Sequence, residues 1–242
     1  MKKIVSIVIV ALAFVLATYI ATQAFKDRNG YLETIQVTGL GKKDFTSDLI
    51  VWSATFSKKD YSLSNAYTLL KKDQEIIRNY LTSKGVLAEE IVFSATSIHK
   101  DFNYRYDANG NSTSTFTGYR LTQSVEIESK AIEAIEVVSR EITELINNGV
   151  ELYSNTPQYY YTKLSELKIE MIAAATEDAR LRAEKIAAHA KAQLGDLKQA
   201  RMGIFQIIGQ NSNEDFSWGG TFNTTSKMKT ATITMKLQFG IK

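Results

Sequence analysis

Cysteine is absent from this chain of 242 residues, and proline occurs once, as Pro157. Without cysteine there are no disulfides, no thiolate nucleophiles and no cysteine-ligated metals. A single proline excludes proline-rich linkers and leaves little sign of a boundary between domains. We therefore expect the folded part to be one domain of ordinary size, stabilised by its hydrophobic core and by assembly alone.

An excess of charge of one sign is also lacking. The formal net charge is +3, and Lys2 and Lys3 are two of the 29 basic residues, so 27 basic residues face 26 acidic ones in the rest of the chain. A nearly neutral domain does not have the basic surface of a nucleic-acid-binding protein. The composition therefore predicts no nucleic-acid partner.

Motifs for catalysis and for cofactors are missing too. The two histidines, His99 and His189, are not spaced for a zinc site, and there is no phosphate-binding loop or serine nucleophile elbow. The segment 39–41 (Gly-Leu-Gly) is not followed by the third glycine of a dinucleotide-binding loop, so we interpret it as a turn. The sequence thus predicts a protein that is not an enzyme, with no catalytic, cofactor-binding or metal-binding residues. A carboxylate pair that assembles only in space stays open.

The N-terminus carries one long apolar run. Residues 4–25 contain no acidic or basic side chain, and at the helical rise they span about 33 Å, enough to cross a bilayer. This length favours an uncleaved signal anchor over a cleaved signal peptide, which would leave a soluble periplasmic protein. The preceding lysines favour a single pass through the inner (cytoplasmic) membrane, with the C-terminal domain in the periplasm or outside. The residues we assign to the membrane anchor are Ile4, Val8, Leu12, Val15 and Ile20.

The rest of the chain alternates between strand and helix patterns. We take residues 1–25 as the anchor or signal peptide, 26–32 as a linker and 33–242 as one α+β domain. Apolar residues recur at every second position in several segments, which predicts half-buried strands in mainly antiparallel sheets. These strand segments are 33–39, 48–57, 90–106, 115–128, 151–156, 197–209 and 230–241.

Three helices are expected to pack on the sheet or sheets. The first begins at an N-cap, Ser62, and the second at Ser129. The third, from Tyr161 to Gly195, has one face rich in alanine, so its backbone should lie close and flat across a sheet. The apolar positions read on that helix are Ile169, Ile172, Ala173, Ala179, Ala183, Ile186, Ala187, Ala190 and Leu194.

Exposed aromatic residues are the best functional indication in the sequence. The loop 210–227 is long and polar but carries three large aromatic side chains, and tyrosines gather on a predicted hairpin and at the start of the third helix, residues 159–161. Such residues either cover the core or form a contact with another subunit or partner. The residues that we assign to a possible interface are Tyr104, Tyr106, Tyr159, Tyr160, Phe216, Trp218 and Phe222.

The order of these features resembles the SIMPL-domain family, which includes bacterial periplasmic immunogenic proteins. The features that match are the segment 35–41, the Gly85-Val86 and Gly149-Val150 helix ends, the Tyr104-x-Tyr106 hairpin returning through Gly118-Tyr119, the alanine-rich stretch 173–187 and Leu194-Gly195. The chain departs from the family at Phe102-Asn103, where members often have a proline, and in its aromatic loop. The resemblance implies an exported α+β domain of unknown function, oligomeric in some relatives and tied to envelope stress, with no established catalytic residues.

Three functional hypotheses follow from these observations. The first is a membrane-anchored extracytoplasmic scaffold that self-assembles as a homo-oligomer, for instance as a ring, and binds other envelope proteins. The second is a monomeric envelope module that binds a small ligand or a peptide, with the long loop as a lid. The third is a hydrolase with a spatially assembled site. We favour the first.

Overall fold

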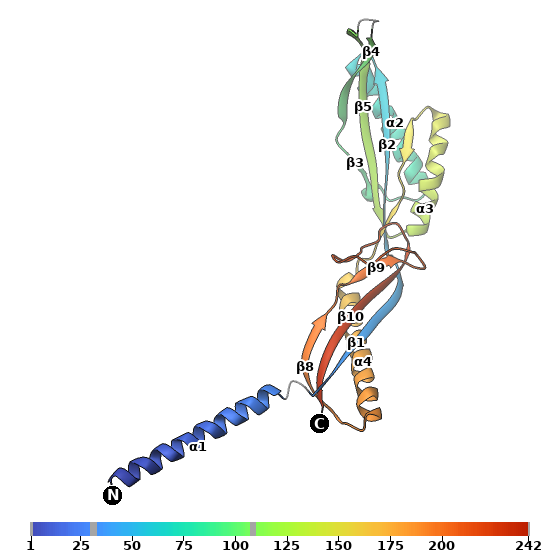
Figure 1. Cartoon of the computed structure of the whole chain (residues 1–242). Coiled ribbons are helices and arrows are strands. Elements are labelled where there is room, and N and C mark those ends of the chain that lie inside the picture. Colours follow the sequence, from blue (N-terminus) through green and yellow to red (C-terminus); the bar gives the residue numbers. More distant parts are fainter. Residues whose placement is uncertain (1, 30–32, 107–109, 242) are drawn as a thin grey trace.

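The computed structural model describes residues 2–29, 33–106 and 110–241, with the side chains of residues 2–10 and 26–29 left out. It is an α+β fold with antiparallel sheets and four α-helices within these ranges, as predicted (Figure 1). The helices are α1 (Lys2–Asn29), α2 (Leu63–Ser83), α3 (Ile132–Glu141) and α4 (Leu164–His189), with short 3-10 helices at Ala88–Glu90 and Ile142–Asn148. The strands are β1 (Thr34–Thr46), β2 (Leu49–Asp60), β3 (Ile91–Phe93), β4 (Ser97–Tyr106), β5 (Ser112–Ser129), β6 (Leu152–Ser154), β7 (Gln158–Tyr160), β8 (Leu194–Met202), β9 (Gln206–Gly209) and β10 (Met228–Ile241).

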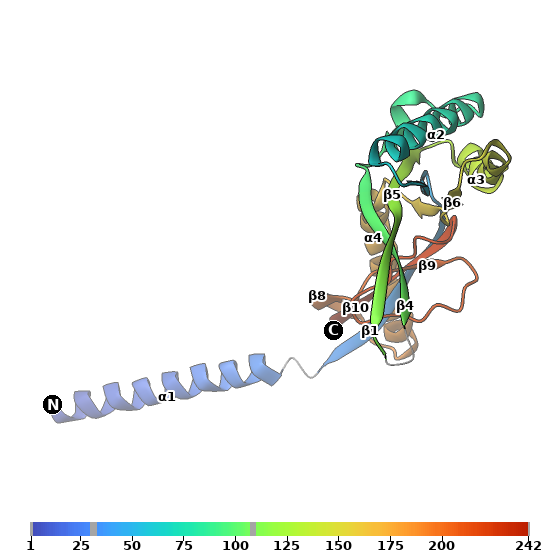
Figure 2. The same ribbon diagram turned by 90° about the horizontal axis from the view of Figure 1, so that it is seen from above.

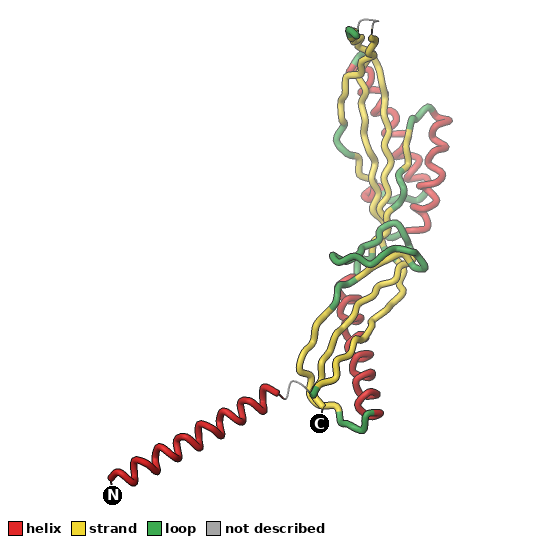
Figure 3. The backbone as a smooth tube through the Cα atoms, viewed as in Figure 1, coloured by secondary structure: helices red, strands yellow, loops and turns green. Residues whose placement is uncertain are grey.

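The strands form two separate sheets, each with its own core (Figure 3). The terminal lobe combines both ends of the folded chain, because its sheet has the order β1-β10-β8, with β9 also paired to β10. The middle lobe holds the intervening strands in the order β3-β5-β2-β6, with β4 on β5 and β7 on β2. The alternation within residues 33–242 thus builds two lobes, a division that the sequence pattern did not indicate.

Helices cover one face of each sheet. In the middle lobe, α2 and α3 lie on the same side of the sheet, over the alternate residues Trp52, Ala54 and Phe56 of β2 (Figure 2). Ser62 caps α2 as predicted, and its hydroxyl accepts a hydrogen bond from the amide of Asn65. The predicted cap of α3 is wrong, because the helix begins after Ala131 and Ser129 accepts the amide of that residue instead.

Helix α4 lies flat across the terminal sheet, as its small side chains predict. Its buried residues follow a spacing of four: Leu167, Met171, Ala175, Ala179, Ala183 and Ala187. This face is narrower than predicted, since Ile169 and Ile186 are exposed. Residues four apart form a ridge that is inclined to the helix axis. The small side chains on this ridge let the helix approach β1 closely.

The glycines of β1 face this row. The predicted turn at residues 39–41 is wrong, because β1 continues through them and pairs with β10 over its full length. A Cβ atom at Gly39 would overlap the backbone of Ala175 and Ala179, and one at Gly41 would lie 2.5 Å from the carbonyl oxygen of Met171. The glycines are therefore required by the close approach of α4 rather than by a change in chain direction.

Several other helix and strand boundaries differ from those predicted from the local sequence pattern. Pro157 separates β6 from β7, so Tyr159 and Tyr160 belong to a strand paired with β2 and not to the start of the third helix. The predicted strands 90–106 and 197–209 are each interrupted, at residues 94–96 and 203–205. The predicted turn at residues 107–111 lies partly outside the described residues.

The two lobes meet at a joint formed by residues 46–49, 159–162 and 223–229. Here the amide of Tyr159 donates to the carbonyl of Thr224 (2.7 Å), and that of Ser47 donates to the carbonyl of Lys227 (2.9 Å). Lys229 is only 1% exposed, and its ammonium donates to the carbonyls of Tyr159 (3.0 Å) and Ser226 (2.6 Å). The joint is thus tied by backbone hydrogen bonds and by one buried lysine.

The N-terminal helix α1 covers the predicted anchor. Leu12, Val15 and Ile20 are exposed on it, while the side chains of Ile4 and Val8 lie outside the described residues. In the part of the chain that is described, no helix is both long and apolar enough to cross a membrane. The predicted membrane span is therefore not supported by the structure.

The contact between β1 and α4 yields a first prediction. Gly39→Ala should lower the free energy of unfolding by about 3 kcal/mol, because the added methyl group must displace the helix backbone. Denaturant unfolding of the purified protein measures this change. Gly219→Ala is the control, since the nearest atom to an added Cβ there lies 4.0 Å away. Equal unfolding midpoints for the two variants would contradict the proposed role of the glycine.

Lys229 yields a prediction about pH. Burial lowers its pKa from the ordinary 10.5 to about 8, and Glu214 opposes part of the shift. Between these values the unfolded chain binds more protons than the folded one, so stability rises as pH increases from 8 to 10. The free energy of unfolding of the wild type, relative to Lys229→Met, should therefore rise by about 2 kcal/mol over this range. A difference that stays constant with pH would show that the lysine is not desolvated.

Candidate functional site

The structure does not bring the predicted interface residues onto one surface. They lie in three places: Tyr104 and Tyr106 near the end of the β4-β5 hairpin, Tyr159, Tyr160 and Phe222 at the joint, and Phe216 and Trp218 above the terminal sheet. Each group is held by different elements and has a different environment.

The β4-β5 hairpin extends toward the far end of the middle lobe (Figure 1). It carries exposed aromatic side chains. Phe102, Tyr104 and Tyr106 occupy alternate positions of β4, and the two tyrosines are 60% and 74% exposed. Phe102 packs on Phe116 of β5, with ring centroids 5.7 Å apart. Among the described residues β4 pairs only with β5, so its outer edge has no strand partner.

At the joint, Tyr159 and Tyr160 have different environments. Tyr159 is half-buried against the core of the middle lobe, and its hydroxyl donates to Glu136 (3.0 Å). Burial, and then the hydrogen bond to this carboxylate, raise the pKa of Tyr159 to about 12. Tyr160 lies beside Phe222, with ring centroids 6.4 Å apart. Tyr159 thus packs against the core of the middle lobe, and its assignment to an interface stays a prediction.

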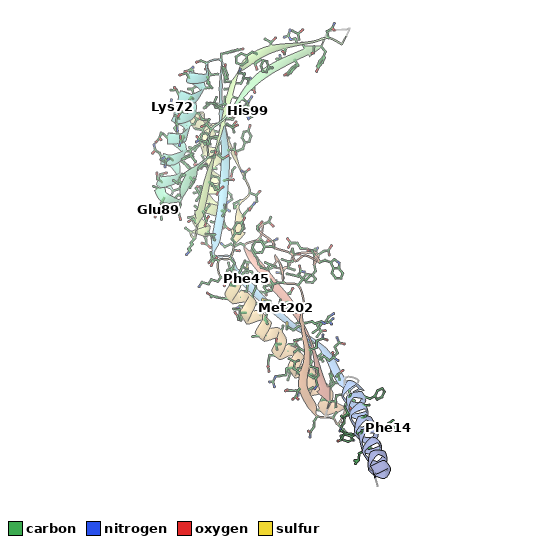
Figure 4. All side chains as sticks on the ribbon, turned by 90° about the vertical axis from the view of Figure 1, so that its left-hand side faces the viewer. Phe14, Phe45, Lys72, Glu89, His99 and Met202 are labelled. Carbon is green, nitrogen blue, oxygen red and sulfur yellow. The ribbon has the colours of Figure 1, made fainter. Side chains whose placement is uncertain are left out.

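The aromatic loop, residues 210–227, is held at several points. The side-chain amide of Gln206 donates to the carbonyl of Ser217 (2.7 Å), and Glu214 accepts the amide of Gly209 (3.0 Å). The backbone of Ile207 also donates to Thr221 and accepts from Asn223. The loop thus folds back along β9, and Figure 4 shows it projecting from the joint near Phe45 and Met202.

This fixed loop still leaves two aromatic rings in solvent. Trp218 is 96% exposed and Phe216 is 64% exposed. An indole ring this open makes almost no contribution to the core, although such a ring is costly to leave in water. Packing in the core therefore does not explain its position.

A groove of about 790 Å³ lies between the loop and the open face of the terminal sheet. This face is the one that α4 does not cover, and the antiparallel register places Leu40 opposite Thr234 and Lys42 opposite Thr232. The other residues that line the groove are Asp44, Gly203, Ile204, Gln206, Ile208, Gln210, Asn211, Ser212, Phe216, Ser217, Trp218, Thr230, Ile233 and Lys236. Its volume falls within the range of about 300–1,000 Å³ that is typical of small-molecule sites.

The charges of the groove are unbalanced. Asp44 is the one carboxylate among the described residues that line it, and this group already accepts from Thr230 (2.6 Å) and Gln210 (3.3 Å). Lys42 and Lys236 form no ion pair within the described part of the chain. The groove therefore presents two unpaired cations to a ligand.

The groove offers apolar, hydroxyl and cationic groups that can contact a ligand. No histidine lines it: His99 lies on β4 beside Ser97, and His189 contacts the carbonyl of Lys185 at the end of α4. No cluster of potential metal ligands is found among the described residues. The sequence did not predict Lys42 and Lys236 as site residues. Two features of the sequence could have indicated them. Lys42 directly follows the segment 39–41 that we interpreted as a turn, and Lys236 lies on β10, the strand with regular alternation.

Comparison with known proteins identifies the family of the chain. None of the curated proteins compared with it matches. The family model SIMPL, described as a protein of unknown function (DUF541), matches residues 35–236. This range covers most of the chain and includes both lobes, from β1 to β10. The chain therefore belongs to the SIMPL family, as its sequence features suggested.

Proposed function

We propose that this protein is a non-catalytic component of the cell envelope that associates with itself through the outer edge of β4. The observation that carries the proposal is the combination of an open strand edge with exposed tyrosines, Tyr104 and Tyr106, on that strand. An unpaired edge offers a row of backbone donors and acceptors to another chain. Exposed aromatic side chains beside it supply the apolar contact area that protein interfaces favour.

The geometry of β4 suits a contact between two identical copies. Alternate residues of a strand point to the same face, so Phe102, Tyr104 and Tyr106 form one row. If two β4 strands pair in antiparallel fashion, the same row occurs on both partners and the contact is closed by two-fold symmetry. Larger assemblies then require a second contact, for which Phe216, Trp218 and Phe222 in the terminal lobe remain proposed interface residues.

Attachment to the membrane is a further part of the proposal. It is supported by the apolar residues 4–25, which α1 contains, and by Lys2 and Lys3 before them. With this orientation the two lobes lie outside the cytoplasm. The assembly then acts as a scaffold for other envelope proteins, a role that the family resemblance connects with envelope stress.

Self-association is tested by the mass of the full-length protein in detergent, measured by light scattering. We expect a defined multimer, which persists in a shortened chain that begins at Lys26. Replacing both Tyr104 and Tyr106 with serine should weaken association at least about tenfold, because such aromatic residues dominate interface energies.

The matched control is Tyr153→Ser, since Tyr153 is 63% exposed on β6. This variant should retain the mass of the wild type. A monomeric wild type, or equal losses in the control and in the double variant, would refute association through β4.

Membrane attachment is tested by flotation with phosphatidylcholine vesicles on a density gradient. The full-length protein should float with the vesicles and stay bound after washing at high salt, because the attachment is apolar. The chain that begins at Lys26 should remain at the bottom of the gradient. Flotation of both chains, or of neither, would refute an anchor in residues 1–25.

A further inference from the structure

The groove of the terminal lobe has a shape that limits what it binds. Thr230, Thr232, Thr234 and Lys236 occupy every second position of β10 along it. At the rise of a strand these positions span about 20 Å. The groove is therefore elongated along β10, with the aromatic loop at one side.

The occupant must bind through side chains and not as an added strand. Both edges of β10 are already used, because β1 pairs along one side and β8 and β9 pair along the other. The groove lies over the face of the sheet, where the backbone offers no free row of hydrogen bonds. An extended peptide would gain nothing here from backbone pairing. A narrow small molecule fits these limits better.

The residues of the groove separate into apolar and cationic groups. Leu40, Ile204, Phe216 and Trp218 provide apolar surface, and the exposure of Leu40 (46%) and Ile204 (45%) leaves it accessible. Lys42 and Lys236 provide positive charge without carboxylate partners, since Asp44 is occupied by Thr230 and Gln210. An anion with an apolar body would satisfy both groups at once.

Polar groups for orienting such a molecule are also present. The hydroxyl of Ser212 is buried at the groove and has no hydrogen-bond partner among the described residues. A buried hydroxyl without a partner is costly, and a ligand oxygen would satisfy it. The hydroxyls of Thr232 and Thr234 lie on the open face beside the two lysines.

We propose that the groove binds a single-chain amphipathic carboxylate, whose apolar chain lies against Leu40, Phe216 and Trp218 while Lys42 or Lys236 binds the carboxylate. The site is distinct from the proposed β4 contact, because β4 belongs to the other lobe, but it shares Phe216 and Trp218 with the second contact proposed for larger assemblies. The inference therefore does not depend on association through β4.

Trp218 makes the test direct. The chain has two tryptophans, and the other one, Trp52, is 1% exposed in the core of the middle lobe. Octanoate is the probe, added to the purified full-length protein, with octan-1-ol as the uncharged analogue of equal chain length. Octanoate should produce a saturable blue shift of the tryptophan emission, and octan-1-ol should bind at least about tenfold more weakly. Trp218→Phe should abolish the shift.

Charge variants identify the carboxylate site. Replacing Lys42 and Lys236 with alanine should weaken octanoate binding at least about tenfold and leave octan-1-ol binding unchanged. Both lysines are exposed, so the fold tolerates the change. The control is Lys43→Ala, which removes the same charge from the opposite face of β1, where Lys43 pairs with Glu170 (2.6 Å). This variant should bind octanoate like the wild type.

Three results would overturn the proposal: a shift that does not saturate, equal binding of octanoate and octan-1-ol, or an equal loss of binding in Lys43→Ala. The variant with both Tyr104 and Tyr106 replaced by serine distinguishes a failure of octanoate binding from a failure of self-association. It should bind octanoate with unchanged affinity even where its mass falls to that of a monomer.

Discussion

The contact between the glycines of β1 and the alanines of α4 determines the form of the terminal lobe. With no side chain at Gly39 and only methyl groups at Ala175 and Ala179, the helix backbone lies against the strand. Asp178 reinforces the contact by accepting the amide of Leu40 (2.8 Å), and this amide lowers the pKa of the carboxyl, with a smaller contribution from Arg182. This helix covers one face of the sheet, and the other face lines the groove.

The parts of the fold that depend on local periodicity were predictable. The alternation in β2 and β10, the cap at Ser62 and the flat alanine-rich helix all follow from spacings within one segment. The role of Gly39 and Gly41 could not be predicted in this way, because a glycine that allows a turn and a glycine that allows close packing look the same in the sequence of one strand. What distinguishes them is a helix far along the chain, which local pattern cannot place.

The candidate site was less predictable for the same reason. The sequence indicates the aromatic loop, and Trp218 and Phe216 in it are exposed. The residues that give the groove its charge, however, come from β1 and β10, which are paired strands far apart in the sequence. Tyr159 shows the converse case. We predicted it at an interface, whereas its ring packs against the core of the middle lobe and its hydroxyl donates to Glu136. Composition indicates that a loop matters, whereas strand register decides which residues it faces.

The aromatic loop connects the groove with the joint. Gln206 and Glu214 hold its first half beside the groove, while Thr224 and Ser226 in its second half bind Tyr159 and Lys229. Asn223, between these halves, contacts Glu214 and also accepts the amide of Ser226. The same short segment thus contributes both to the wall of the groove and to the joint. Asn223, which is 6% exposed, links its two halves, and Lys229, which is 1% exposed, holds the second half at the joint.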